Sequence, residues 1–327
     1  MKHLSTALTT LVLSSLIATT ALAQSFPSKT ITIVVPTAPG GGNDAMARII
    51  AAKMSTLMNN ATIIVDNKAG ASGAIAAEYV AKAAPDGHTL MWGYIATHST
   101  SPAMQKLKYD PIADFEPIGL TAYSPILMVT TAGLPAQLKT KDNKALVQAL
   151  ISQKSKINYA SAGAGTGPHF AAELFKLNTG ADWVHVPYKG AGPAILDTIS
   201  GQTHLTFSGL FAVVPHVKSG KLHAVAIAGQ KRSSALPEVP TLKELGVEGV
   251  DVTQWYGIFA PAKTPKAIVD QLNKALNQAL TDKDVVAKIE SQGVDVETST
   301  PEGLKKFVAS ELAKWKRVVQ QAKITAE

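Results

Sequence analysis

Four glycine-rich segments are the parts of this sequence whose composition best suits ligand chemistry. Each follows an apolar run and precedes a helical pattern; they span residues 36–44, 66–73, 161–169 and 187–192. Glycine lets a ligand approach the backbone closely. A helix start offers unpaired N–H groups and a positive dipole end, which suit a carboxylate or a phosphate. One such segment is as easily an ordinary turn, but four of them favour a cleft that grips an anion.

The side chains of these segments are mostly small or hydroxylic. Ser72 and Thr166 carry hydroxyls that either cap a helix or bind a ligand, and Asn43 or Asp44 suits a helix N-cap. His169 directly follows the third segment and is as easily a helix-surface residue as a ligand contact. The only cations in the four segments are Lys68 and Lys189. We therefore expect neutral dipoles, rather than an ion pair, to hold the anion.

The sequence lacks convincing motifs of nucleotide-binding proteins, hydrolases and metalloproteases. Residues 40–45 fit a degenerate dinucleotide fingerprint with Asp66 as the ribose-binding acid, but Pro36 and Pro39 lengthen the turn. The third segment lacks the Lys-Ser/Thr ending of a phosphate-binding P-loop. The sequence contains neither Gly-x-Ser-x-Gly nor His-Glu-x-x-His, and it has no cysteine. We expect no catalysis, no cofactor and no metal.

The first residues indicate export. Lys2 precedes an apolar run over residues 4–18, and Ala21-Leu22-Ala23 forms a small-x-small cleavage signal, so the mature chain is expected to begin at Gln24 in the periplasm. The formal net charge of +7 comes from scattered basic residues, which favours a mild attraction of anions over a nucleic-acid groove. We expect a monomer that binds no nucleic acid.

The elements that position the four segments alternate between strand and helix. The pattern predicts two β-α-β-α-β units, each with a parallel sheet, and a helical tail. The expected strands are 30–35, 62–65, 89–94, 118–130, 157–160, 183–187, 205–208 and 222–227. The expected helices are 43–57, 73–84, 144–153, 168–179 and 191–200, with two more beginning at Thr264-Pro265 and Thr300-Pro301 as N-cap and first residue.

Several of these blocks resemble the tripartite tricarboxylate transporter substrate-binding proteins, the Bug family. The resemblance begins with the Pro-Thr-Ala-Pro-Gly-Gly-Gly-Asn-Asp segment and continues in the family's order over nearly the whole mature chain. The further blocks are 65–73, 85–90, 186–190, 237–241 and 255–261. Thr166 stands where many relatives have serine, which keeps the hydroxyl.

The resemblance implies an α/β, type II periplasmic-binding-protein fold with a ligand cleft between two domains. Domain 1 would comprise residues 24–124 and 229–327, and domain 2 residues 125–228. It also implies a small carboxylate ligand (a dicarboxylate, tricarboxylate, acidic amino acid or aromatic acid) and a two-component membrane permease, although a sensing role is an alternative. The family's ligand contacts fall on Ala38, Pro39, Gly40, Gly41, Asp44, Ser72, Gly73, Ala162, Gly163, Gly165 and Thr166, with His169 adjacent.

Overall fold

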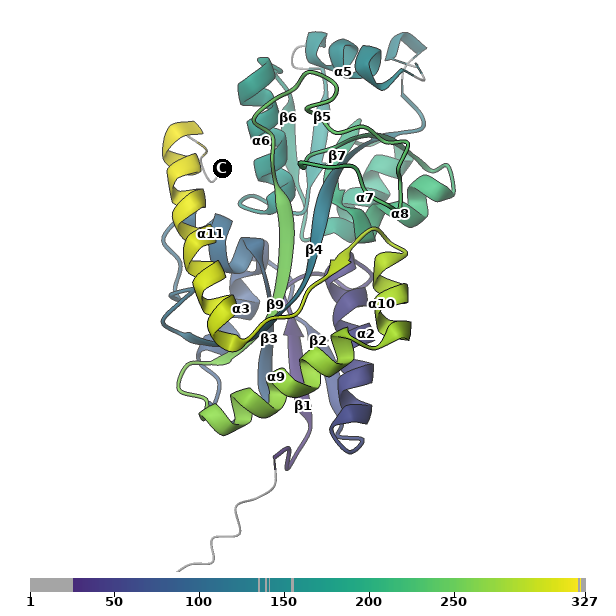
Figure 1. Cartoon of the computed structure of the whole chain (residues 1–327). Helices are drawn as coiled ribbons and strands as arrows, with labels where there is room; N and C mark the ends of the chain where they lie inside the picture. Colours follow the sequence, from purple (N-terminus) through teal and green to yellow (C-terminus); the bar gives the residue numbers. More distant parts are fainter. Residues whose placement is uncertain are drawn as a thin grey trace, which may run out of the picture.

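The structure, a computed structural model, has two lobes that share their longest strands (Figure 1). It describes residues 26–327 except 135, 139, 141, 154–155, 323 and 325–327. The expected signal peptide therefore lies outside the described residues. Within the described part of the chain, no helix has both the length and the apolar character needed to cross a membrane.

The first lobe is built on the strand order β2-β1-β3-β9-β4. The strands β1, β2 and β3 are parallel, as predicted, and β9 runs antiparallel to β3. β-Branched residues favour extended backbone, and β1 is almost wholly buried. These strands and the helices around them are β1 (Ile31–Val35), α2 (Gly42–Leu57), β2 (Ile63–Asn67), η1 (Ala71–Gly73), α3 (Ala74–Ala81), β3 (Thr89–Tyr94), η2 (Ala96–Thr100), α4 (Ser101–Met104) and β9 (Thr253–Pro261).

The second lobe is built on the strand order β4-β7-β5-β6, with β8 also paired to β4. Here β5 pairs in parallel with both β6 and β7, which confirms the second predicted α/β unit. Its elements are α5 (Asn143–Ser152), β5 (Asn158–Ser161), α6 (Gly167–Thr179), β6 (Val184–Pro187), α7 (Ala191–Ser200), β7 (Leu205–Gly209), α8 (Leu210–Lys218) and β8 (Leu222–Ile227), with the short turn η3 (Ala136–Leu138) before α5.

The strand β4 (Phe115–Thr131) passes from one lobe to the other. Residues 115–125 pair with β9, whereas Ile126–Thr131 pair with β7 and β8, so the strand changes sheets just after Pro125. The chain returns to the first lobe between β8 and β9. Two crossings of extended backbone therefore join the lobes, and Figure 1 shows β4 and β9 running between them.

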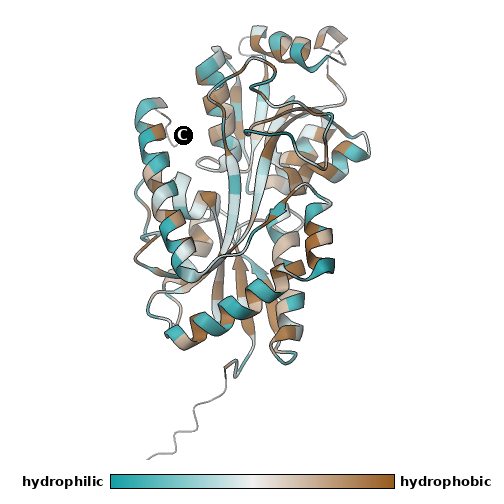
Figure 2. Cartoon of the chain, viewed as in Figure 1, coloured by the Kyte–Doolittle hydropathy of each residue, from teal (hydrophilic) through white to brown (hydrophobic). Residues whose placement is uncertain are grey.

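The C-terminal helices close the first lobe and reach the second. These are α9 (Lys266–Leu280), α10 (Lys283–Glu290) and α11 (Pro301–Ala322), with the short strand β10 (Asp295–Val296) between the last two. Apolar residues at helical spacing bury one face of α9, while its outer face is hydrophilic (Figure 2). The indole of Trp315 on α11 packs against Phe170 of α6, with ring centroids 5.2 Å apart. The helix α11 therefore contacts both lobes.

The structure refines the predicted helices. The helix expected over 73–84 is confirmed as α3 (Ala74–Ala81), which follows a 3₁₀ turn over residues 71–73. Thr264 does not cap α9: Pro265 is the N-cap residue and the Thr264 hydroxyl bonds the Pro261 carbonyl. The helix α8 was not predicted, since it is apolar on most sides and contains Pro215.

Candidate functional site

A small cavity of about 30 Å³ lies between the two lobes, and we call it the central cavity. Both lobes contribute to its wall. The first lobe supplies Thr37, Gly41, Gly42, Asn43, Tyr94, Gln254 and Tyr256, and the second supplies Ala162, Thr166, Pro168, Ala191, Ser208, Gly209, Phe211 and Ala212. Residues from both lobes therefore face a molecule bound there.

A second, larger space opens beside the central cavity. This side cavity has a volume of about 280 Å³ and shares Thr37, Tyr94 and Ala162 with the central cavity. Its remaining wall comes from Pro36 after β1, from the turn after β2 and from the segments after β5 and β6. The central cavity alone holds roughly two water molecules, so an organic acid needs either the side cavity or some separation of the lobes.

Four helices begin at the central cavity, and none of them has a side-chain cap. The helices α2, α6, α7 and α8 start at Gly42, Gly167, Ala191 and Leu210, and no side chain accepts a hydrogen bond from their first N–H groups. By contrast, α5 and α10, which begin elsewhere, are capped by the carboxylates of Asp142 and Asp282. The cavity therefore gathers helix N-termini whose donors are left for another acceptor.

Two buried hydroxyls in the cavity wall also lack a partner. Thr37 Oγ1 and Ser208 Oγ are buried and have no hydrogen-bond partner among the described residues. A buried polar atom without a partner costs free energy, so such atoms in a cavity wall indicate a ligand that satisfies them. A carboxylate accepts hydrogen bonds from both O–H and N–H donors.

The wall of the central cavity contains no charged side chain among the described residues. Lys189 lines only the side cavity, and Lys68 is engaged by Asp66 at 3.0 Å and lies over the Tyr79 ring. The arrangement can therefore stabilise an anion by dipoles and hydroxyls. It offers no nucleophile paired with a base, since none of its wall residues is a Lys, His, Asp or Glu.

The first predicted loop, residues 36–44, contributes backbone more than side chain. Of its predicted residues only Gly41 lines the central cavity; Ala38, Pro39 and Gly40 do not. The Asp44 carboxylate receives Gly40 N–H at 3.0 Å and Arg48 Nε at 2.9 Å. Burial raises the pKa of Asp44, but these hydrogen bonds outweigh it and the pKa lies below its ordinary value. Asp44 therefore fixes the loop, with Arg48 as its anchor.

The second predicted loop points across the cleft. Ser72 and Gly73 line the side cavity. Ser72 has φ of 53°, a strained conformation for a residue with a side chain, and its hydroxyl donates to the Ala164 carbonyl of the second lobe. Its proton is thus used between the lobes in this structure.

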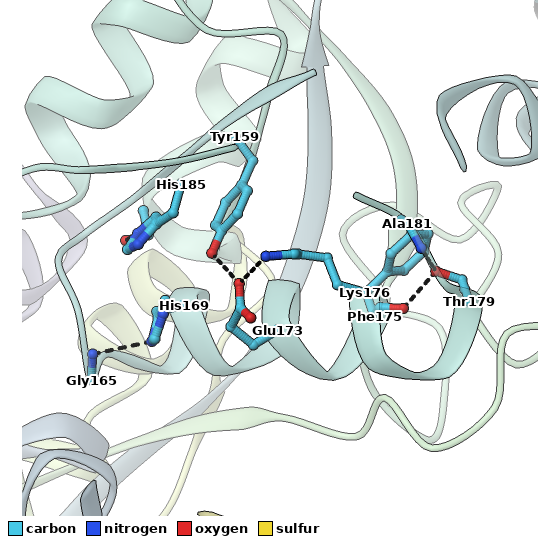
Figure 3. A network of polar contacts seen from close by, with 10 residues as sticks. Tyr159, Gly165, His169, Glu173, Phe175, Lys176, Thr179, Ala181 and His185 are labelled. Atoms are coloured by element: carbon cyan, nitrogen blue, oxygen red, sulfur yellow. Dashed lines mark hydrogen bonds and ion pairs between the residues drawn. The ribbon is translucent and has the colours of Figure 1, made fainter. Parts of the chain in front are cut away.

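The third predicted loop is held rigid from within the second lobe. Thr166 lines the central cavity but donates its hydroxyl proton to Gly163 O at 2.6 Å. Ala162 lines both cavities and Gly163 the side cavity, whereas Gly165 and His169 line neither. Instead, Gly165 N–H donates to His169 Nδ1 at 3.2 Å (Figure 3).

A buried polar network supports this loop from behind. His169 stacks on His185, which bonds Ser161 Oγ at 2.7 Å, and Tyr159 donates to Glu173 (Figure 3). Burial, together with the neighbouring His185, lowers the pKa of His169 to about 4, so its ring is neutral at pH 7. A neutral ring leaves Nδ1 free to accept the Gly165 N–H, and His169 thereby supports the loop from below.

The residues that sequence reasoning missed come mainly from the junction of β7 and α8. Ser208 and Gly209 end β7, and Phe211 and Ala212 lie in the first turn of α8, so a strand again leads into a helix as in the four predicted segments. The Ser208-Gly209 pair at the end of a strand is the sequence feature that could have indicated a fifth ligand-binding segment. Thr37 and Asn43 lie inside the first predicted segment, and Tyr94 and Tyr256 come from the strands β3 and β9.

Two α/β lobes, joined by two crossings and closing on a cavity lined by helix N-termini, define a binding protein of the periplasmic type. Residues 46–324 match the tripartite tricarboxylate transporter family receptor. The chain is also similar to the protein BugT of Bordetella pertussis, at 33% identity over 91% of each chain. The chain belongs to this receptor family, which confirms the resemblance found in the sequence.

Two solved structures share both the fold and substantial identity. MatC from Rhodopseudomonas palustris with bound malate is 36% identical, with a TM-score of 0.84 over 90% of this chain and all of that one. An R. palustris protein solved with adipate is 33% identical, with a TM-score of 0.87 over 92% of this chain and 99% of that one. These similarities confirm the predicted two-domain α/β fold and the role of a solute-binding receptor.

Proposed function

We propose that this receptor captures a small carboxylated organic acid in the central cavity and delivers it to a membrane permease. The uncapped starts of α2, α6, α7 and α8 around one cavity carry the proposal. A hydrogen bond to a charged group is worth about 1.5–3 kcal/mol, so several such donors reach micromolar affinity after the cost of association. The malate and adipate bound by two relatives supply the first acids to test.

The domain assignment follows the strand pairing. We propose that residues 24–124 with 229–327 and residues 125–228 move as two bodies, because the sheet changes just after Pro125 and the chain returns between β8 and β9. Separation of these bodies lets the acid in, and their approach buries it. We further propose that the mature chain begins at Gln24, acts in the periplasm as a monomer and pairs with a two-component permease.

A thermal-shift series tests the carboxylate claim. Malate and adipate are compared with adipamide, which matches adipate in length but has no charge. An acid present at a hundred times its Kd stabilises the folded protein by about 2.7 kcal/mol. The unfolding temperature of the protein should therefore rise by several degrees. Adipamide should have no effect. Equal shifts with the acid and the amide, or no shift with any carboxylate in a wider panel, would refute the proposal.

A further inference from the structure

Three hydroxyls of the first lobe donate to two adjacent carbonyls of the second lobe. Thr100 Oγ1 lies 2.5 Å and Ser101 Oγ 3.2 Å from the Gly165 carbonyl oxygen. Ser72 Oγ donates to the neighbouring Ala164 carbonyl. Thr100 and Ser101 line neither the central nor the side cavity. We infer that these three residues form an interlobe latch, in which Thr100 and Ser101 act as positioning residues that set ligand affinity without touching the ligand.

The donors of the latch are held firmly in the first lobe. Thr100 ends the π-helical turn η2 and Ser101 begins α4, so the change of helix type places both hydroxyls at one spot. Turns of this kind recur at functional sites. The same turn is fixed by Tyr109, whose hydroxyl donates to the Thr97 carbonyl at 2.7 Å. Thr100 is fully buried and Ser101 is 1% exposed, so opening of the cleft brings both into water.

The acceptors are equally well placed in the second lobe. The bonds of Thr166 to Gly163 and of Gly165 to His169 fix the loop that carries both acceptor carbonyls. Gly165 has φ of +80°, and a Cβ atom there would lie 2.6 Å from Ser101 Oγ. Glycine is therefore required for the loop to approach the donors this closely.

The latch has a consequence that a direct ligand contact does not have. The apparent affinity of a ligand falls with the fraction of protein in the binding-competent state. Bonds between the lobes favour closure for every ligand alike. Removing one of them should speed dissociation by the same factor for all ligands, whereas loss of a ligand contact changes the ratio between ligands. This part of the inference rests on the proposed function; the closure equilibrium itself does not.

The closure equilibrium is measured without ligand. The chain has no cysteine, so Ile75→Cys and Leu196→Cys, at exposed positions on α3 and α7, give one spin label per lobe. Pulsed dipolar spectroscopy should find the short distance of the closed form in the otherwise unchanged protein. Thr100→Val should lower the ratio of closed to open molecules about three- to tenfold, the usual effect of one hydrogen bond. Ser101→Ala should act in the same direction, and Thr100→Ser should restore the ratio.

Thr264→Val is the matched control, because its buried hydroxyl also donates to a carbonyl, at 2.8 Å, but within the first lobe. It should leave the distances unchanged. A wild-type protein with only the long distance, or a ratio changed less than twofold by both latch variants, would overturn the latch.

Stopped-flow dissociation of malate and adipate provides the second readout. Thr100→Val should release both acids about three- to tenfold faster, with the ratio between the two rates preserved. The latch would also be overturned if Thr100→Val released the acids no faster than Thr264→Val, or if the ratio between the malate and adipate dissociation rates changed. If neither acid binds the wild-type protein, the choice of ligand fails, while the distance measurement still decides the latch.

Discussion

Ser208 and Thr37 stand out at the scale of single residues, because their buried hydroxyls face the central cavity without a partner among the described residues. The hydroxyl of Thr166, which the sequence indicated as a ligand donor, instead donates to the Gly163 carbonyl. We therefore propose Ser208 and Thr37, rather than Thr166, as the hydroxyl donors to the ligand. Loop composition indicates hydroxyl groups but not their orientation, since whether a hydroxyl turns inward depends on tertiary packing.

Ser208→Ala should therefore weaken carboxylate binding about tenfold or more, because a hydrogen bond to a charged group is lost at nearly constant shape. Lys189→Ala should change affinity less than threefold, since this side chain does not line the central cavity. Isothermal titration calorimetry on both variants gives the comparison. If Lys189→Ala abolishes binding while Ser208→Ala has no effect, an ion pair holds the acid.

His169 links the site to pH. Its pKa of about 4 in the folded protein lies below the ordinary value of 6.5, because burial and His185 disfavour the charged ring. Below pH 6.5 the unfolded chain therefore binds a proton that the folded chain does not. Folding stability from this residue is fully present above pH 6.5 and falls by up to about 1.4 kcal/mol per pH unit as pH drops toward 4.

The variant His169→Asn keeps an acceptor for Gly165 N–H but does not titrate. Urea unfolding between pH 7 and 5 should show a shallower loss of stability in this variant than in the wild type. Burial lowers the pKa of His98 to about 3, so His98 also makes folding stability fall with pH, and it does so equally in both proteins. Identical slopes would show that His169 is charged in the folded state. Glu173, Lys176 and His185 are the titratable groups that act on His169 and are unchanged in the comparison.

At the scale of elements, four helices without a side-chain cap begin around one cavity. The helices α3 and α9 also lack such a cap, so the clustering of the four starts, rather than the missing caps alone, points to a ligand site. Asp142 and Asp282 cap helices away from the cavity, whereas glycine or threonine without a capping bond precedes the four helices at it. A carboxylate cap stabilises a helix. We therefore expect the ligand's carboxylate to take the place of the missing caps at the four helix starts around the cavity.

Gly41→Asp tests this exchange. The backbone of Gly41, with φ of −84° and ψ of 170°, accepts any residue, and a Cβ there meets only ordinary contacts. The new carboxylate should cap α2 and preserve the unfolding temperature. It should also repel the ligand by about 3 kcal/mol, or roughly a hundredfold in affinity. Gly41→Asn, the neutral control, should bind more tightly than Gly41→Asp; equal affinities would show that charge at this helix start does not matter.

The alternation of β-branched runs and helical patterns predicted most strands and both parallel units. The periodicity failed at α8, whose apolar residues and internal proline do not show the pattern of an amphipathic helix, and so the junction of β7 and α8 was missed as part of the site. This failure lies at the cleft, where contacts with the other lobe override local preference.

At the scale of the whole molecule, we expect the chain to be exported and its signal peptide to be removed before it binds ligand. The triplet ending at Ala23 predicts a mature chain that starts at Gln24. Intact-mass analysis of a periplasmic fraction should give the mass of residues 24–327. The mass of the full-length chain, recovered with the membranes, would contradict this. Size-exclusion chromatography of the same material tests the expected monomer.

We expect the two-lobed architecture to let weak, neutral groups bind a charged solute. Closure would gather donors from both lobes around the central cavity, where electrostatic interactions are stronger than in water. The strand β4 pairs in both sheets and joins the two lobes.

A crystal structure with a bound acid tests the central claim most directly. The account predicts a carboxylate between the lobes, with its oxygens within 3.2 Å of Ser208 Oγ and of backbone N–H groups at the starts of α2 and α8. No Lys or Arg nitrogen should lie within about 4 Å of it. An acid held outside the cleft, or paired directly with Lys189, would contradict the account.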